Sequence, residues 1–170
     1  EADCANGIIA ASAGNHAQGV ALAAQHRSIK ALIVMPRTTP GIKVKAVQSL
    51  GGKTLLHGDT YDEAYTHALQ LAEQRSMVFI HPYDDPEVIA GQGTIAMELL
   101  QQHTDGLDAV FVPVGGGGLI AGIAAYIKAL RPEIRVIGVE PEDAPCMYEA
   151  LKRKRRVVLD QVGIFVDGVA

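Results

Sequence analysis

Four consecutive glycines are the feature of this sequence with the clearest chemical meaning. They are Gly115, Gly116, Gly117 and Gly118, and they stand between an apolar run and a second apolar stretch that begins at Leu119. Because glycine has no Cβ atom, successive backbone N–H groups can turn toward one point, and the start of a following helix adds partial positive charge there. A tight turn that only brings a helix close to a sheet needs fewer glycines. We therefore interpret residues 115–119, called the glycine turn below, as a site for the phosphate group of a ligand.

Two common nucleotide-binding motifs fit the glycine turn poorly. A P-loop ends in Gly-Lys-Ser or Gly-Lys-Thr, whereas Leu119 and Ile120 stand at those positions here. The dinucleotide fingerprint G-x-G-x-x-G would need a glycine in place of Ile120, and a count from Gly117 to Gly122 shifts the spacing. The sequence thus excludes ATP bound through a P-loop. A nicotinamide-binding domain remains as an alternative that rests on the number of glycines alone.

A second candidate site is a short polar string, called the polar turn below: Ser12, Ala13, Gly14, Asn15 and His16. It follows the apolar run 7–11 and precedes a helical pattern, so we expect it at the carboxyl end of a strand. Ligands of open α/β sheets bind at that edge, and the free N–H groups of a helix start favour a carboxylate or a phosphate. In the alternative interpretation, Ser12 or Asn15 only caps the helix. The sequence identifies no carboxylate partner for His16, and we assign this histidine no general-base role.

The spacing of apolar residues predicts strands that alternate with helices along the chain. Expected strands cover residues 7–11, 31–35, 53–56, 77–80, 109–114 and 135–140, and expected helices cover 16–26, 42–50, 59–74, 87–103 and 119–130. Thr60 with Glu63 forms a capping-box pattern at the start of the third helix. Parallel strands need crossover connections, so this alternation predicts an α/β fold with open, mainly parallel sheets flanked by helices. Residues 81–86, with two prolines and two acids, break both periodicities and predict a boundary between two subdomains, 1–85 and 86–170.

Composition restricts the class of partner. Fifteen basic against nineteen acidic residues give a formal net charge of −4, which provides no general attraction to nucleic acid or to anionic lipid. Cys4 and Cys146 lie far apart in the sequence without the spacing of a zinc site or a disulfide framework, and the apolar runs are shorter than the ~20 residues of a membrane span. We expect a cytoplasmic protein with neither nucleic-acid nor membrane partners. The basic run 152–156 is interpreted as a solvated helix end or loop.

Taken together, the two turns resemble motifs of the fold-type II (tryptophan synthase beta-like) family of pyridoxal-phosphate enzymes, and most closely those of the threonine deaminases. The resemblance extends over essentially the whole chain: residues 9–21, which include the polar turn, look like the substrate-loop signature of that family, and residues 31–36, 88–94 and 112–119 look like its further motifs in the same order. The resemblance implies a small substrate-loop subdomain over residues 1–85. It also implies part of a large subdomain that binds the cofactor phosphate over residues 86–170, both subdomains being incomplete.

The resemblance also implies roles for individual residues. Pyridoxal 5′-phosphate would place its phosphate in the glycine turn, formed by Gly115, Gly116, Gly117, Gly118 and Leu119. Asn15 would donate a hydrogen bond to the ring hydroxyl of the cofactor, and Gly168 would lie beside the ring. The amino-acid carboxylate would be received by Ser12, Ala13, Gly14 and His16.

The implied reaction is the dehydration and deamination of L-threonine to 2-oxobutanoate and ammonia, the first step of isoleucine biosynthesis, with the cofactor as electron sink. Deamination or racemisation of serine on the same scaffold, and a catalytically silent module that binds a phosphorylated ligand, are the alternatives. A homo-oligomer is the usual assembly in this family. Glu140 and Ala144 match a metal-site pattern of the serine racemase branch, but Cys146 replaces its aspartate, so we expect no metal.

One expected part of the motif set is missing from this sequence. Enzymes of this family hold the cofactor on a lysine in a Ser-Phe-Lys-x-Arg-Gly string upstream of the polar turn, and these 170 residues contain no such string. A Schiff base needs a positioned, desolvated amine, so none of the lysines present is assigned to this role. We therefore expect the chain to be an internal piece of a longer enzyme and to be inactive by itself.

Overall fold

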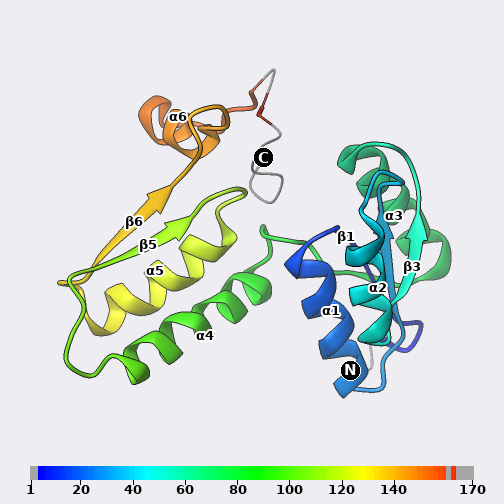
Figure 1. Cartoon of the computed structure of the whole chain (residues 1–170), viewed down its shortest axis with the longest axis horizontal. Coiled ribbons are helices and arrows are strands. Elements are labelled where there is room, and N and C mark those ends of the chain that lie inside the picture. The colour runs from blue at the N-terminus through cyan, green and yellow to red at the C-terminus, as the bar shows by residue number, and fades with distance from the viewer. Residues whose placement is uncertain (1–3, 160–161, 164–170) are drawn as a thin grey trace. The chain divides into compact units, whose positions relative to one another are not determined.

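The computed structural model describes residues 4–159 and 162–163, and the statements below concern these residues. Gly168, expected beside the cofactor ring, lies outside them. The chain divides into two compact units, Glu1–Pro82 and Tyr83–Ala170, which we call unit 1 and unit 2 and describe separately (Figure 1). The sequence placed the subdomain boundary after residue 85.

Unit 1 is a parallel sheet in which strands alternate with helices. Its described elements are β1 (Ile8–Ala11), α1 (Asn15–His26), β2 (Ala31–Met35), α2 (Gly41–Ser49), β3 (Lys53–Leu56), α3 (Tyr61–Arg75) and β4 (Val78–Phe79). The strand order is β3-β2-β1-β4, and each pairing is parallel. In this register Ile8 lies opposite Ala31, and Leu32 lies opposite Lys53. Because the strands run the same way, the turns that follow their carboxyl ends lie at one edge of the sheet.

Helices cover both faces of this sheet (Figure 1). Successive side chains of a strand point to opposite faces, so Ile8 packs with α1 residues such as Val20, whereas Ile9 packs with α3 residues such as Leu71. Burial on both faces explains why β1 and β2 are continuous apolar runs rather than alternating ones. The polar turn therefore begins from a rigid, fully buried strand.

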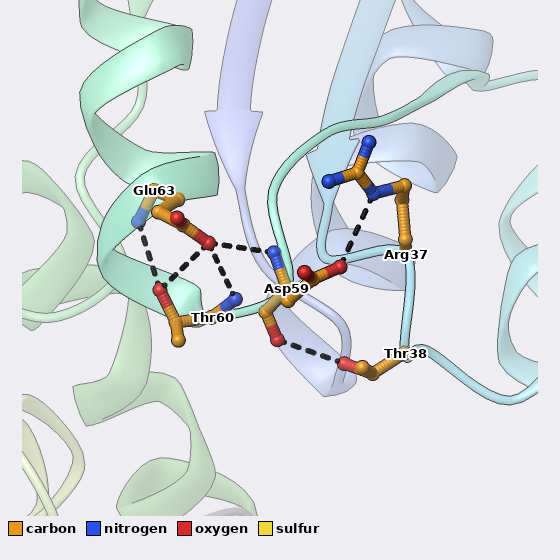
Figure 2. Close-up of polar contacts among 5 residues, drawn as sticks. All are labelled: Arg37, Thr38, Asp59, Thr60 and Glu63. Atoms are coloured by element: carbon orange, nitrogen blue, oxygen red, sulfur yellow. Dashed lines mark hydrogen bonds and ion pairs between the residues drawn. The ribbon is translucent and has the colours of Figure 1, made fainter.

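The turns at the carboxyl edge of unit 1 are linked by polar contacts (Figure 2). Nε of Arg37 lies 3.2 Å from the Asp59 carboxylate, and Oγ1 of Thr38 donates to the carbonyl of Asp59 at 3.1 Å. The Arg37 and Asp59 side chains are both well exposed, so this ion pair contributes little to stability. Its effect is to join the β2–α2 and β3–α3 connections.

Unit 2 places helices on a parallel strand pair. Its described elements are α4 (Pro86–Gln102), β5 (Ala109–Pro113), α5 (Gly118–Leu130), β6 (Arg135–Val139) and α6 (Cys146–Arg153). β5 and β6 pair in parallel with Val110 opposite Val136, and α5 is the crossover helix between them. The core of unit 2 is formed by Ala96, Val112, Ile123, Ile127 and Ile134. These observations agree with the predicted α/β class.

α4 and α5 approach each other closely through glycine. A Cβ atom at Gly122 would lie 2.7 Å from the backbone nitrogen of Gly93 and would also overlap the carbonyl oxygen of Ile89. A Cβ atom at Gly93 would lie 3.2 Å from the carbonyl oxygen of Gly122. The two helices can pack at this distance only because both positions lack a side chain.

The helix α6 has no counterpart among the elements expected from the sequence. In the described part of the chain it buries none of its side chains, and it is only eight residues long. Its start is held by the Glu140 carboxylate, which accepts hydrogen bonds from the backbone nitrogens of Met147 and Tyr148, each at 2.7 Å. The basic run 152–156 covers the exposed end of α6, which confirms its interpretation as a solvated helix end. None of the described helices is both long and apolar enough to cross a lipid bilayer.

Candidate functional site

The glycine turn connects the end of β5 to the start of α5. Gly117 is the N-cap residue of α5 and has a φ of +92°, a left-handed conformation that favours glycine. Among the described residues, no backbone carbonyl accepts a hydrogen bond from the N–H groups of residues 115–119. The N–H groups on either side are paired, that of Val114 with Val139 and that of Ala121 with Gly117. The turn therefore presents a row of backbone donors that a phosphate can occupy.

Two side chains from elsewhere in unit 2 enclose the glycine turn. A Cβ atom at Gly116 would lie 2.5 Å from ring atom Cδ2 of Tyr83, so this ring packs directly on the glycine backbone. A Cβ atom at Gly118 would lie 2.5 Å from the carbonyl oxygen of Tyr83 and 2.9 Å from its Cα atom. At Gly117 the neighbour would be Cε of Met147, at 2.7 Å. Glycine is thus required for close packing as well as for conformation.

Two helices that do not follow a candidate turn, α3 and α4, have side chains that accept hydrogen bonds from their first backbone N–H groups. The Thr60 side chain accepts from the backbone nitrogen of Glu63, and the Glu63 carboxylate accepts in return from the nitrogens of Thr60 and Asp59, at 3.0 and 2.6 Å (Figure 2). This is the predicted capping box, and these hydrogen bonds lower the pKa of Glu63. At the start of α4, the Asp85 carboxylate accepts from Glu87 at 2.8 Å.

The helices that follow the candidate turns are different. In the part of the chain that the structure describes, neither α1 nor α5 has a side-chain cap or an acidic residue in its first turn. Their positive N-terminal ends are therefore not compensated by the chain itself, and an anion would be stabilised at either end. The α2 helix is also uncapped, so this feature alone does not define a site. At α5 it coincides with the N–H groups of the glycine turn, which have no backbone acceptor in the described part of the chain.

The polar turn is held by a local hydrogen bond. Oγ of Ser12 accepts from the backbone nitrogen of Gly14 at 3.2 Å, and Gly14, not Ser12 or Asn15, is the N-cap residue of α1. The alternative in which Ser12 or Asn15 caps the helix is therefore wrong. Asn15 is the first helical residue and is exposed, whereas Ala13 is half-buried between Ser12 and Gly14.

The imidazole of His16 is directed toward strand β4. Its Nε2 atom lies 3.2 Å from the carbonyl oxygen of Ile80, and since a carbonyl only accepts, this nitrogen is the donor. Burial lowers the pKa of His16, the hydrogen bond to Ile80 raises it, His81 lowers it, and the net direction is downward. The ring is thus neutral at pH 7 and engaged in a structural hydrogen bond.

The structure places the predicted residues in two groups. Ser12, Ala13, Gly14, Asn15 and His16 form one continuous turn of unit 1, and the glycine turn lies in unit 2. Sequence reasoning missed Tyr83 and Met147 as neighbours of the glycine turn, because both are distant from it in sequence and carry no motif. The described residues contain no group of three or more His, Cys, Asp or Glu side chains that could hold a metal ion. Glu140 serves instead at the start of α6.

Comparison with known proteins identifies the family. Residues 1–170 match the family described as pyridoxal-phosphate dependent enzyme. The chain belongs to this family. The L-threonine dehydratase biosynthetic IlvA of Pasteurella multocida is 63% identical over 166 residues, which are 98% of this chain and 32% of that protein. The chloroplastic biosynthetic threonine dehydratase of Arabidopsis thaliana is 58% identical over 166 residues, 98% of this chain and 28% of the relative.

Solved structures of this pyridoxal-phosphate dependent family have the same fold. The processed form of threonine deaminase isoform 2 from Solanum lycopersicum has a TM-score of 0.94 at 54% identity, covering 100% of this chain and 47% of that one. Maize serine racemase has a TM-score of 0.92 at 35% identity, covering 99% and 51%. The chain spans about a third of the length of the curated relatives quoted above.

The family cofactor and the glycine turn are compatible. Backbone donors and an uncompensated positive helix end stabilise a phosphate group, and among the described residues the glycine turn offers N–H groups without a backbone acceptor at the uncapped start of α5. The four glycines keep the backbone free of side chains at this point. The residues present therefore fit the phosphate of pyridoxal phosphate.

Proposed function

We propose that the protein to which this chain belongs catalyses the dehydration and deamination of L-threonine to 2-oxobutanoate and ammonia. The observation that carries the proposal is the row of N–H groups in the glycine turn that have no backbone acceptor among the described residues, found in a chain 63% identical to a biosynthetic L-threonine dehydratase. Pyridoxal phosphate, when bound, supplies an electron sink for the negative charge that develops at the substrate Cα atom. The residues of this chain bind and orient the cofactor and the substrate.

We assign the phosphate of the cofactor to the backbone donors of the glycine turn and to the positive end of α5. The exposed side chain of Asn15 is assigned to the ring hydroxyl of the cofactor, and Gly168 to its ring. The uncapped start of α1 favours the substrate carboxylate at the polar turn, where Ser12, Ala13 and Gly14 provide backbone and hydroxyl groups. His16 contributes indirectly, because its bond to Ile80 fixes the turn. Unit 1 is thus proposed as the substrate-loop subdomain and unit 2 as the phosphate-binding subdomain.

The substrate is proposed to be threonine rather than serine. Relatives 55–63% identical to this chain are named threonine dehydratases, and the fold is also that of a serine racemase. A single methyl group in a pocket is worth only about 1–3 kcal/mol, so a threonine enzyme would accept serine at a reduced rate. A homo-oligomer located in the cytoplasm is proposed as the working form, in agreement with the free thiols of Cys4 and Cys146.

The test is an assay of the intact protein with pyridoxal phosphate and each amino acid in turn. We expect 2-oxobutanoate from L-threonine, and pyruvate from L-serine with a kcat/KM lower by about tenfold or more. Formation of D-serine as the main product, or no product from either amino acid, would show that the proposal is wrong.

A second test examines the Asn15 assignment. Replacement of Asn15 by alanine is expected to weaken cofactor binding, measured by equilibrium dialysis. Asn6, which is also exposed in unit 1, provides the matched control, and Asn6→Ala should bind the cofactor normally. Equal affinities in both variants would remove Asn15 from the site.

A further inference from the structure

Tyr83 occupies a position next to the glycine turn that no sequence motif marks. It lies two residues ahead of Asp85, the N-cap of α4, and it contacts the turn in two ways. Its ring packs on Gly116, and its backbone packs on Gly118. The residue is 40% exposed, and it is not part of the apolar core of unit 2.

These contacts act on the part of the turn whose N–H groups have no backbone acceptor among the residues that the structure describes. Gly117, between the two contacted glycines, is held at a φ of +92°. A backbone without side chains has many accessible conformations, and four glycines in succession would otherwise give a mobile segment. Tyr83 restricts one side of this segment, while Met147 approaches Gly117.

We propose that Tyr83 is a positioning residue for the phosphate of the cofactor: its ring and backbone hold the glycine turn in the conformation in which its N–H groups converge. The proposal rests on the proposed function, since it concerns the same phosphate site. Preorganised donors bind an anion more tightly than donors that must first be ordered. Tyr83 therefore acts on affinity through the turn and needs no contact of its own with the ligand.

The proposal predicts a selective effect on phosphate recognition. The experiment compares Tyr83→Phe and Tyr83→Ala in the intact protein, with Tyr148→Ala as control, because Tyr148 is in the same unit and is 61% exposed. Equilibrium dialysis gives the dissociation constants for pyridoxal phosphate and for pyridoxal, which lacks the phosphate. Far-UV circular dichroism confirms that each variant is folded.

We expect Tyr83→Ala to weaken binding of pyridoxal phosphate by about tenfold or more, the equivalent of one hydrogen bond to a charged group. Binding of pyridoxal should remain within about twofold, and Tyr83→Phe and Tyr148→Ala should leave both constants within the same limit. If Tyr83→Ala weakens the binding of both ligands equally, or weakens the binding of neither, the proposal is wrong. If the unchanged protein binds pyridoxal phosphate no more tightly than pyridoxal, the proposed phosphate site itself fails.

A second variant tests the contact between Tyr83 and Gly116 by a change at the glycine. Gly116→Ala places a Cβ atom within 2.7 Å of Cδ1 of Tyr83 and must displace the ring. It should weaken the binding of pyridoxal phosphate to a similar degree. In a Tyr83→Ala/Gly116→Ala double variant the losses of binding free energy should not add, because both substitutions remove the same contact. Gly116→Ala by itself tests the contact if Tyr83→Ala does not fold, and normal binding of pyridoxal phosphate by Gly116→Ala would then contradict the proposal. If both variants fold, full additivity in the double variant would contradict it.

Discussion

His16 shows how a residue of a candidate site can serve the structure rather than the chemistry. Its Nε2–H donates to the Ile80 carbonyl, and burial keeps the ring neutral by lowering its pKa. A neutral, engaged imidazole is unsuited to bind a carboxylate by charge. The histidine instead connects the polar turn to the end of β4, so its removal is expected to disturb the turn and the stability of unit 1 together.

The lowered pKa of His16 predicts a dependence of stability on pH. The unfolded chain takes up a proton at His16 below about pH 6.5, the usual value for histidine, whereas the folded chain takes it up only at lower pH. The free energy of unfolding should therefore fall as the pH decreases from 6.5 through the lowered pKa. The share of this pH dependence that comes from His16 should be absent in His16→Gln. Urea unfolding at several pH values measures it.

The matched control is His26→Gln, at the exposed end of the same helix. It should keep the pH dependence of the unchanged chain. If His16→Gln and the unchanged chain lose stability in parallel between pH 7.5 and pH 5, about the range in which histidine titrates, burial of His16 is not the cause.

The contact between Tyr83 and Gly116 could not be predicted from the sequence, although the glycine turn itself could. The glycine run indicated unpaired backbone donors, because glycine conformational freedom is a local property. Which side chain packs on the run depends on how the chain returns to it through α4, and no local pattern encodes that. The glycine turn could be found from the sequence as a candidate site, but the side chains that pack on it could not.

The starts of the helices show the same distinction between local and distant signals. The capping box of α3 was predicted, because Thr60 and Glu63 are neighbours in sequence. The start of α6 was missed, because its backbone donors are satisfied by Glu140 from beyond the helix. The strands Ala31–Met35 and Lys53–Leu56 were predicted with their observed bounds, since Pro36 and Gly52 limit them in sequence.

The capping box of α3 predicts a measurable contribution to stability. Thr60→Ala removes the side-chain oxygen that accepts from the Glu63 nitrogen, and should lower the free energy of unfolding by about 1 kcal/mol. Thr66→Ala, at an exposed position within the same helix, should have no such cost, because alanine favours a helix interior. Chemical denaturation of the two variants provides the comparison, and equal stabilities would show that the box contributes nothing.

The division of the chain into two units follows from where its apolar side chains are buried. Unit 1 has a core on each face of its sheet, and unit 2 has a separate core that includes Val112 and Ile127. The prolines and acids of residues 81–86 led to an expected boundary after residue 85, because such a segment cannot continue a strand or a helix. A change in one core should therefore be felt mainly in its own unit.

Gly122 provides the test of this independence. Gly122→Ala introduces a Cβ atom that overlaps the carbonyl oxygen of Ile89 and lies 2.7 Å from the nitrogen of Gly93, so α4 and α5 must move apart. Overpacking of this kind costs about 1–3 kcal/mol. Amide hydrogen exchange should show faster exchange across α4 and α5, whereas protection in β1 and β2 should be unchanged.

The control for Gly122 is Gly91→Ala, the same substitution in α4 at an exposed position where a Cβ atom meets nothing within 4 Å. This variant should be slightly more stable, by up to about 1 kcal/mol, because alanine loses less backbone entropy in a helix. If Gly122→Ala also accelerates exchange in β1 and β2, the two units unfold as one cooperative structure. Protection lost in unit 2 alone would mean that unit 2 can unfold while unit 1 stays folded.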